Sequence, residues 1–127
     1  MNQADIQSVM LVDSPVHPID YSRTLATVVQ WIMERPRPVP YIVQANVHSL
    51  VSGQEDSHYR KMLTSANLIV PDGMPLVWLL RAKGHPVKDR VYGPDLMLML
   101  CKEAARSGWQ CFLYGGKEGV PEELARV

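Results

Sequence analysis

Short apolar runs alternate with longer helical patterns along this chain, and no other feature constrains the fold as strongly. Strands are expected at residues 6–13, 39–45, 67–70 and 109–114. Helices are expected at 17–36, 49–66, 74–84 and 94–108, and a further helix begins within 117–127. Strands that alternate with helices favour a parallel sheet with both faces covered. The sequence therefore predicts an α/β fold with a Rossmann-like, mostly parallel sheet and helices on both faces.

Prolines and glycines mark the ends of the expected helices. Pro75 lies near the start of one helix and Gly84 lies just past its end, which is the asymmetry typical of helix termini. Pro94 and Asp95 open the next helix, and Gly108 closes it. These signals make the helix at 94–108 the best defined of the chain.

Two helices also predict which of their side chains are buried. In the first helix Leu25, Val28, Val29 and Ile32 recur at three- and four-residue steps, which indicates one buried face. The helix at 74–84 is apolar nearly all round, so we expect it to be buried on several sides.

Length and composition bound the class of protein. A chain of 127 residues is one domain or a piece of one. Its net charge of zero and the lack of a basic stripe give no reason to expect nucleic acid as a partner. Cys101 and Cys111 lie outside any metal or redox spacing and are predicted to be buried core residues.

The two ends of the chain bear on where the protein is located and on how much of a domain it contains. The stretch MNQADIQSVMLVDSP lacks the basic leader and long apolar core of a secretory signal, and no segment reaches the roughly 20 apolar residues of a membrane helix. We therefore expect a cytoplasmic protein. The last helix has no stop signal where another strand should follow, so residues 1–127 are expected to be the N-terminal part of a single domain truncated at its C-terminus.

Candidate site residues gather where the expected strands end, because ligands of open α/β sheets bind beyond the carboxyl ends of the strands. If the strands are parallel, one edge of the sheet collects Gln44, Asn46, Asp72, Gly115 and Gly116. Asp72 is the one charge in NLIVPDGMPLVW, and it is either a reagent or a residue that a turn favours.

Phosphate-binding signals are present but weak. The YGGKEG stretch resembles a phosphate cradle before a helix, yet a tight turn explains it equally well. Arg90 could bind a diphosphate or simply be solvated, and His48 could contact substrate or be structural. The chain has no Asp-x-Asp pair, so we expect no cofactor and no metal, with arginine and helix dipoles holding any diphosphate.

Four stretches taken together, VQANVHSLV, ANLIVPDGMPLVW, RVYGPDLM and CFLYGGKEGVPEELA, resemble the WecG/TagA/CpsF glycosyltransferase family. The resemblance implies an inverting transferase that moves an N-acetylhexosamine, typically N-acetylmannosamine, from a UDP-sugar to a sugar on a polyprenyl diphosphate. It implies work at the cytoplasmic membrane face in the synthesis of teichoic acid linkage units, enterobacterial common antigen or exopolysaccharides. Membrane contact is implied for a C-terminal part that this chain lacks.

The resemblance also assigns roles. Asp72 matches the family's proposed general base, Asn46 its pocket asparagine and Arg90 its diphosphate-side arginine. Gly115 and Gly116 would offer backbone amides to the departing UDP. The family often has Thr where this chain has Gln44, which leaves the role of Gln44 open, with a different donor sugar as one interpretation.

Other interpretations remain at this point. The chain could be a truncated, non-catalytic remnant that binds a nucleotide at most, and apolar surface left uncovered by truncation could make it a homo-oligomer. A Rossmann-type oxidoreductase is the third reading, but the dinucleotide glycine fingerprint and its acidic partner are absent.

Overall fold

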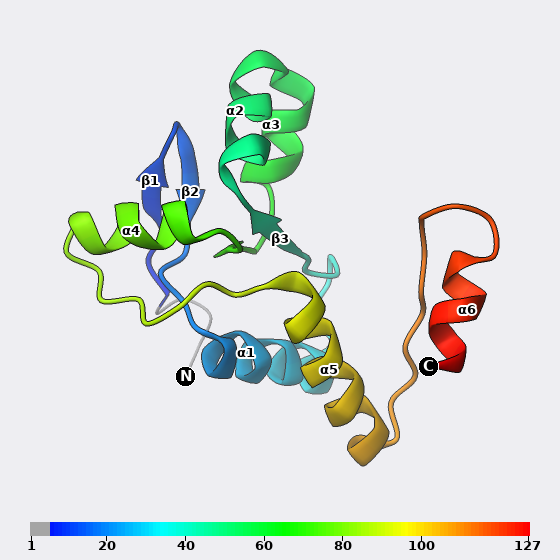
Figure 1. Ribbon diagram of the computed structural model, residues 1–127. Helices are drawn as coiled ribbons and strands as arrows, with labels where there is room; N and C mark the ends of the chain where they lie inside the picture. The colour runs from blue at the N-terminus through cyan, green and yellow to red at the C-terminus, as the bar shows by residue number, and fades with distance from the viewer. Residues whose placement is uncertain (1–5) are drawn as a thin grey trace.

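A computed structural model describes residues 6–127, so the prediction for the N-terminal stretch falls partly outside the described residues. The element order is β1 (Val9–Leu11), β2 (Ser14–Val16), α1 (Tyr21–Glu34), β3 (Ile42–Ala45), α2 (Val47–Glu55), α3 (Ser57–Thr64), β4 (Leu68–Pro71), α4 (Met74–Ala82), α5 (Gly93–Ser107) and α6 (Val120–Arg126). Figure 1 shows how these elements are arranged. The α/β class is confirmed.

The predicted strand at 6–13 is confirmed only over β1, because the chain turns back at Val12 and Asp13 into a hairpin. Strands β1 and β2 pair antiparallel, with Leu11 opposite Ser14. Val12 and Asp13 connect them with φ angles of 49° and 59°. Two left-handed residues make the tight turn whose twist matches that of the flanking strands. The hairpin therefore does not extend a parallel sheet.

Strands β3 and β4 form the parallel pair at the centre of the fold, with Val43 opposite Ile69 and Ala45 opposite Pro71. Every residue of β4 is buried, as is typical of a parallel strand covered on both faces. Successive side chains of a strand point to opposite faces, so Ile69 enters one core cluster and Val70 enters the other.

Helices cover both faces of this pair, as predicted. The first cluster joins β3 and β4 to the hairpin, α2 and α4, and contains Leu11, Val16, Ala45, Leu50, Ile69, Leu76, Val77, Leu80 and Val87. The second joins them to α1 and α5, and contains Ile19, Trp31, Leu68, Val70, Val91 and Leu96. Figure 1 shows α1 and α5 together below β3, and α4 beside the hairpin.

Helix α1 buries a face other than the predicted one. Its buried residues are Thr24, Thr27 and Trp31, whereas Ile32 of the predicted face is 38% exposed. The threonines can be buried because each hydroxyl donates to a carbonyl four residues earlier, at 2.7 Å for Thr24 and 2.8 Å for Thr27. Apolar periodicity could not reveal this face, because two of its three residues are polar.

Two further helix predictions are corrected. The expected helix at 49–66 is two helices, broken at Asp56, whose carboxylate accepts from the His58 and Tyr59 amides and so caps α3. Helix α4 is buried on one side only, because Trp78 is 59% and Leu79 42% exposed.

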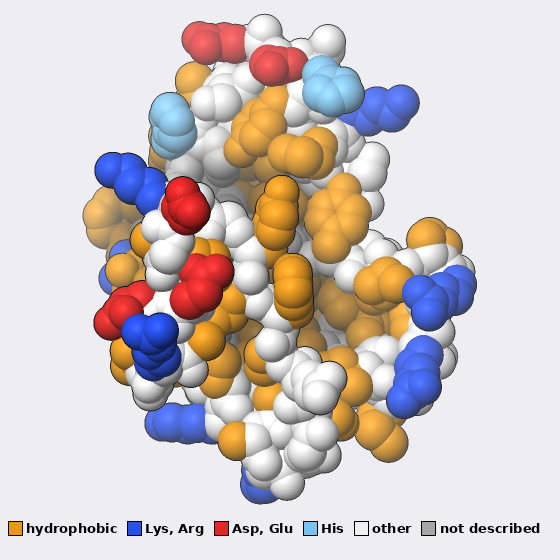
Figure 2. All heavy atoms as spheres, turned by 90° about the vertical axis from the view of Figure 1, so that its right-hand side faces the viewer, with side chains coloured by type: hydrophobic (Ala, Val, Ile, Leu, Met, Phe, Trp, Pro, Cys, Tyr) orange, Lys and Arg blue, Asp and Glu red, His pale blue; other side chains and the backbone are white. Residues whose placement is uncertain are grey.

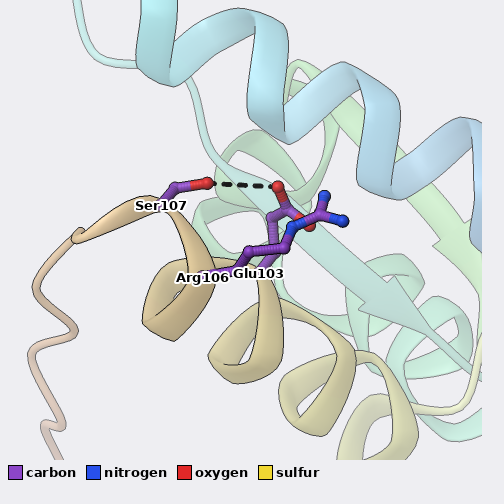
Figure 3. A network of polar contacts seen from close by, with 3 residues as sticks. All are labelled: Glu103, Arg106 and Ser107. Carbon is purple, nitrogen blue, oxygen red and sulfur yellow. Dashed lines mark hydrogen bonds and ion pairs between the residues drawn. The ribbon is translucent and has the colours of Figure 1, made fainter.

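Helix α5 ends as the sequence predicts, with Gly108 in the left-handed conformation at φ 72°. Figure 3 shows the polar contacts of its last turn, where Arg106 pairs with Glu103 at 2.6 Å and the Ser107 hydroxyl donates to Glu103 at 3.2 Å. The Arg106 hydrogen bond lowers the pKa of Glu103. These i,i+3 and i,i+4 contacts support the helix end locally.

The predicted strand at 109–114 is wrong. This segment has no regular structure, and its side chains Phe112 and Tyr114 are 89% and 94% exposed. Figure 1 shows it rising at the right of the molecule and leading into α6. Figure 2, drawn from that side, shows hydrophobic side chains on the surface, with histidines and acidic residues toward the top. Segment 109–114 joins no sheet, and β1 and β2 pair only with each other, so residues 6–127 hold one parallel pair and no Rossmann sheet.

Candidate functional site

The carboxyl ends of β3 and β4 lie side by side because the strands run parallel. Ala45 is paired with Pro71, and the Asp72 amide continues the ladder by donating to the Ala45 carbonyl at 2.9 Å. Asn46 and Asp72 are therefore the first residues beyond two neighbouring strands. Ligands of open α/β sheets bind at such an edge, so it is the candidate site.

An open cavity of about 420 Å³ lies at this edge, on the face that α5 covers. Its polar side chains belong to Gln44 and Asp72, and its other lining residues come from α5: Gly93, Pro94, Leu96, Met97 and Leu100. Alternation along a strand explains this, since Gln44 shares a face with Ile42, which packs against the cluster beneath α5. The structure thus brings two predicted site residues to one cavity.

Gly93 is a site residue that the sequence patterns did not single out. A Cβ atom at residue 93 would lie only 2.5 Å from Oε1 of Gln44, so that side chain would have to move to make room for a larger residue. The available signal was a glycine at the first position of a helix, where most residues are better helix formers. A glycine in such a place marks a close approach by a neighbouring group.

Asn46 lies at the same edge, where its side chain caps the start of α2. Its Oδ1 accepts from the Ser49 amide at 2.9 Å, and the Ser49 hydroxyl accepts from the Asn46 amide at 3.0 Å. This capping box satisfies two free amides at the start of α2. Asn46 packs beside Gly73, where a Cβ would lie 3.7 Å from the Asn46 Cβ, and it is not among the lining residues of the cavity.

Arg90 is brought near this edge by its neighbour. The Val91 amide donates to the Pro71 carbonyl at 2.7 Å, which ties the connector after α4 to the last residue of β4. The Arg90 guanidinium carbon lies 4.4 Å from the centroid of the Tyr92 ring, a cation–π contact. Arg90 itself does not line the cavity.

The sequence model of the glycosyl transferase WecG/TagA/CpsF family matches residues 9–127. The chain belongs to this family. The match includes both strands that carry the candidate site, together with α4 and α5.

Two curated relatives of this WecG/TagA/CpsF protein bear the same name, N-acetylglucosaminyldiphosphoundecaprenol N-acetyl-beta-D-mannosaminyltransferase. The relative from Bacillus spizizenii is 32% identical over 88 residues, which is 68% of this chain and 34% of the relative. The relative from Bacillus subtilis strain 168 is 33% identical over 66 residues, 52% of this chain and 26% of the relative. The aligned part of the chain thus spans about a third of one relative's length and about a quarter of the other's.

The structure does not bring Gly115 and Gly116 to the cavity. Both have positive φ angles, 104° and 76°, which favour glycine in a turn. Both are exposed, neither lines the cavity, and a Cβ at Gly115 would meet nothing within 4 Å. His48 is exposed in the first turn of α2.

The cysteines line a second cavity, of about 460 Å³, between α5 and the residues after it. Cys111 is exposed and Cys101 is partly buried, so the prediction of two core cysteines is wrong. Burial raises the pKa of the Cys101 thiol, and the nearby Cys111 thiol adds to that rise. The cause of the error is the exposure of segment 109–114, which was expected to be a buried strand.

None of the helices within 6–127 has the length and apolar character needed to cross a membrane. The same range contains no group of three or more His, Cys, Asp or Glu side chains arranged to hold a metal ion.

Proposed function

We propose that this chain forms the N-terminal part of a single-domain inverting glycosyltransferase, which moves an N-acetylhexosamine from a UDP-sugar to a sugar on a polyprenyl diphosphate. The observation that carries the proposal is the position of Asp72, beyond the carboxyl end of β4 and on the cavity that it shares with Gln44. Family membership supports glycosyl transfer.

The names of the two relatives support particular substrates. Each name specifies transfer of N-acetylmannosamine to N-acetylglucosaminyl diphosphoundecaprenol. On that basis the donor is UDP-N-acetylmannosamine and the acceptor is a lipid-linked N-acetylglucosamine. Because the acceptor's lipid is held in a membrane, the enzyme would act as a peripheral protein, at the cytoplasmic face. Its product would serve teichoic acid or other cell-surface polysaccharide synthesis.

Asp72 would act as the general base. As the acceptor hydroxyl oxygen forms a bond to the anomeric carbon, the Asp72 carboxylate takes the hydroxyl proton, and the bond from that carbon to the UDP oxygen breaks. Attack from the face opposite the leaving group inverts the anomeric configuration. Among residues 6–127 no hydrogen bond to the Asp72 carboxylate is present, so its oxygens remain available as acceptors.

Arg90 would stabilise the departing UDP. A guanidinium group keeps its charge at all working pH values and donates two parallel hydrogen bonds to a phosphate. The Val91–Pro71 hydrogen bond holds the Arg90 backbone close to the end of β4, and Tyr92 supports the side chain. Gly115 and Gly116 receive no step here, because both are exposed in the turn before α6 and, unlike Arg90, have no neighbour that is hydrogen-bonded to β4.

The test is an incubation of the full chain with UDP-N-acetylmannosamine or UDP-N-acetylglucosamine and a short polyprenyl-diphosphate-N-acetylglucosamine, with and without a chelator. We expect UDP release with the first donor and a loss of about 100- to 10,000-fold in the Asp72→Asn variant, the usual contribution of general-base catalysis. Glu55→Gln, an exposed carboxylate of α2, is the matched control and should keep the wild-type rate.

The results separate the two functions. Wild-type turnover by Asp72→Asn, with a thermal unfolding curve like that of the parent, would end the general-base assignment. A wild-type chain that binds UDP without releasing it from any donor would instead support a remnant that binds nucleotide and does not transfer sugar.

A further inference from the structure

The carboxamide of Gln44 lies directly against Gly93, in space that a Cβ atom at residue 93 would occupy. Gln44 lies in β3, one residue before the end of the strand at Ala45. Its side chain is partly buried against the first turn of α5. A Cβ at residue 93 would lie 2.5 Å from its Oε1, 2.9 Å from its Nε2 and 3.0 Å from its Cδ. Gly93 has no left-handed φ angle, so its effect here is to leave space for this position of the Gln44 side chain and not to supply a special backbone conformation.

The Gln44 amide has hydrogen-bonding capacity that the described part of the protein does not use. Within residues 6–127 no hydrogen bond joins this side chain to another group, although a primary amide offers two donors and one acceptor with two lone pairs. The amide lines an open cavity, where water or a ligand can reach it. Water can satisfy this amide in the free protein, and a ligand group that makes the same hydrogen bonds can take the place of that water.

Apart from Gln44, the cavity is lined by apolar residues of α5 and by one carboxylate. Leu96, Met97 and Leu100 lie three, four and seven residues after Gly93, which places them on the same face of α5. Asp72 supplies the carboxylate of the cavity. A ligand here would meet an amide, an apolar wall and a base within one space of about 420 Å³.

We propose that Gln44, in the space left by Gly93, recognises the 2-acetamido group of the donor sugar. An acetamido group has one N–H donor, one carbonyl acceptor and a methyl group. The Gln44 carboxamide can accept from that N–H and donate to that carbonyl, and the Met97 and Leu100 side chains can receive the methyl. The proposal rests on the proposed function, since it names which part of that donor is read and by which residue.

The site would discriminate between donor sugars because the wrong sugar leaves hydrogen-bonding groups of the site unpaired. A sugar with a hydroxyl in place of the acetamido group cannot match both the amide and the apolar wall, which leaves polar capacity of the site unpaired. The donor lacking the acetamido group should therefore bind more weakly, and removal of Gln44 should remove most of that difference.

The experiment measures the Kd values of the full chain for UDP-N-acetylmannosamine and UDP-mannose by calorimetry, for wild type, Gln44→Ala, Gly93→Ala and Gln110→Ala. We expect a preference for the acetylated donor in wild type that shrinks about 10-fold in Gln44→Ala, the upper part of the range for the net contribution of a neutral hydrogen bond. Gly93→Ala displaces the Gln44 side chain and should shrink the preference in the same direction. Gln110→Ala, an exposed glutamine outside the cavity, should keep it.

The outcomes distinguish this assignment from the transferase itself. An unchanged donor preference in Gln44→Ala, in a chain that still releases UDP from the donor, overturns the role of Gln44 and leaves the transferase standing. A folded wild-type chain that binds neither donor overturns both proposals. Circular dichroism of each variant verifies the fold, and Gly93→Ala provides a second route if Gln44→Ala does not fold.

Discussion

His17 pairs with both backbone groups of Ile69. Its amide donates to the Ile69 carbonyl at 2.8 Å, and its Nδ1 atom accepts from the Ile69 amide at 2.9 Å. Ile69 lies in the middle of β4, and these two groups face the edge of β4 that β3 does not occupy. A single histidine thus replaces part of a neighbouring strand, and it prevents a buried amide from being left without a partner.

This contact predicts a stability that depends on pH. Burial lowers the pKa of His17 below the value of 6.5 for an unperturbed side chain. The unfolded state therefore binds the proton more readily, so the contribution to stability is complete above pH 6.5 and is lost as the pH falls below it. Urea unfolding at about pH 8 and about pH 5 should show the loss.

His17→Asn is the matched variant, because an asparagine Oδ1 can accept from the Ile69 amide and does not titrate. Its free energy of unfolding should change less with pH than that of the parent. Equal pH slopes for parent and variant would show that His17 is not the group responsible.

Neighbouring leucines of α4 should differ strongly in their contribution to stability. Leu80 is fully buried, whereas Leu79 is 42% exposed on the same helix. Leu80→Ala leaves a cavity in the core and should cost about 3 kcal/mol of unfolding free energy. Leu79→Ala should cost about 0.5 kcal/mol or less, as is usual on a surface. Denaturant unfolding measures both, and similar losses would contradict the one-sided burial of α4.

Asn46 should affect stability through its cap and activity through its amide. Asn46→Ala removes the bond to the Ser49 amide and should cost about 1 kcal/mol. Asn46→Asp keeps an acceptor for that amide, so its unfolding free energy should stay close to that of the parent. A fall in sugar transfer by Asn46→Asp at unchanged stability would indicate that the side-chain NH₂ group contacts substrate.

The two thiols should react at different rates. Cys111 is exposed, while burial and the neighbouring Cys111 raise the pKa of Cys101. Since the thiolate is the reactive form, iodoacetamide at about pH 8 should modify Cys111 first. Mass spectrometry of partly modified protein identifies the site, and Cys111→Ser should make Cys101 react faster. Faster modification of Cys101 in the parent would contradict this order.

Helix ends that depend only on nearby residues could be predicted from the sequence. Gly108 ends α5 because a helix stops where a residue adopts left-handed geometry, and this needs no distant contact. Asp56 could have been read in the same way, since aspartate is a good helix cap, but an unbroken helical pattern across it favoured one long helix.

The position of Asp72 after a buried strand and before a proline-initiated helix was determined by the sequence by itself, because apolar runs and turn residues act over a few positions. Only the tertiary structure decided that Gln44 and Asp72 share a cavity with Gly93, and that residues 109–114 stay exposed. The physical reason is that strand pairing and helix docking join residues far apart in the chain. A segment with a strand-like pattern becomes a strand only where another strand offers it hydrogen bonds.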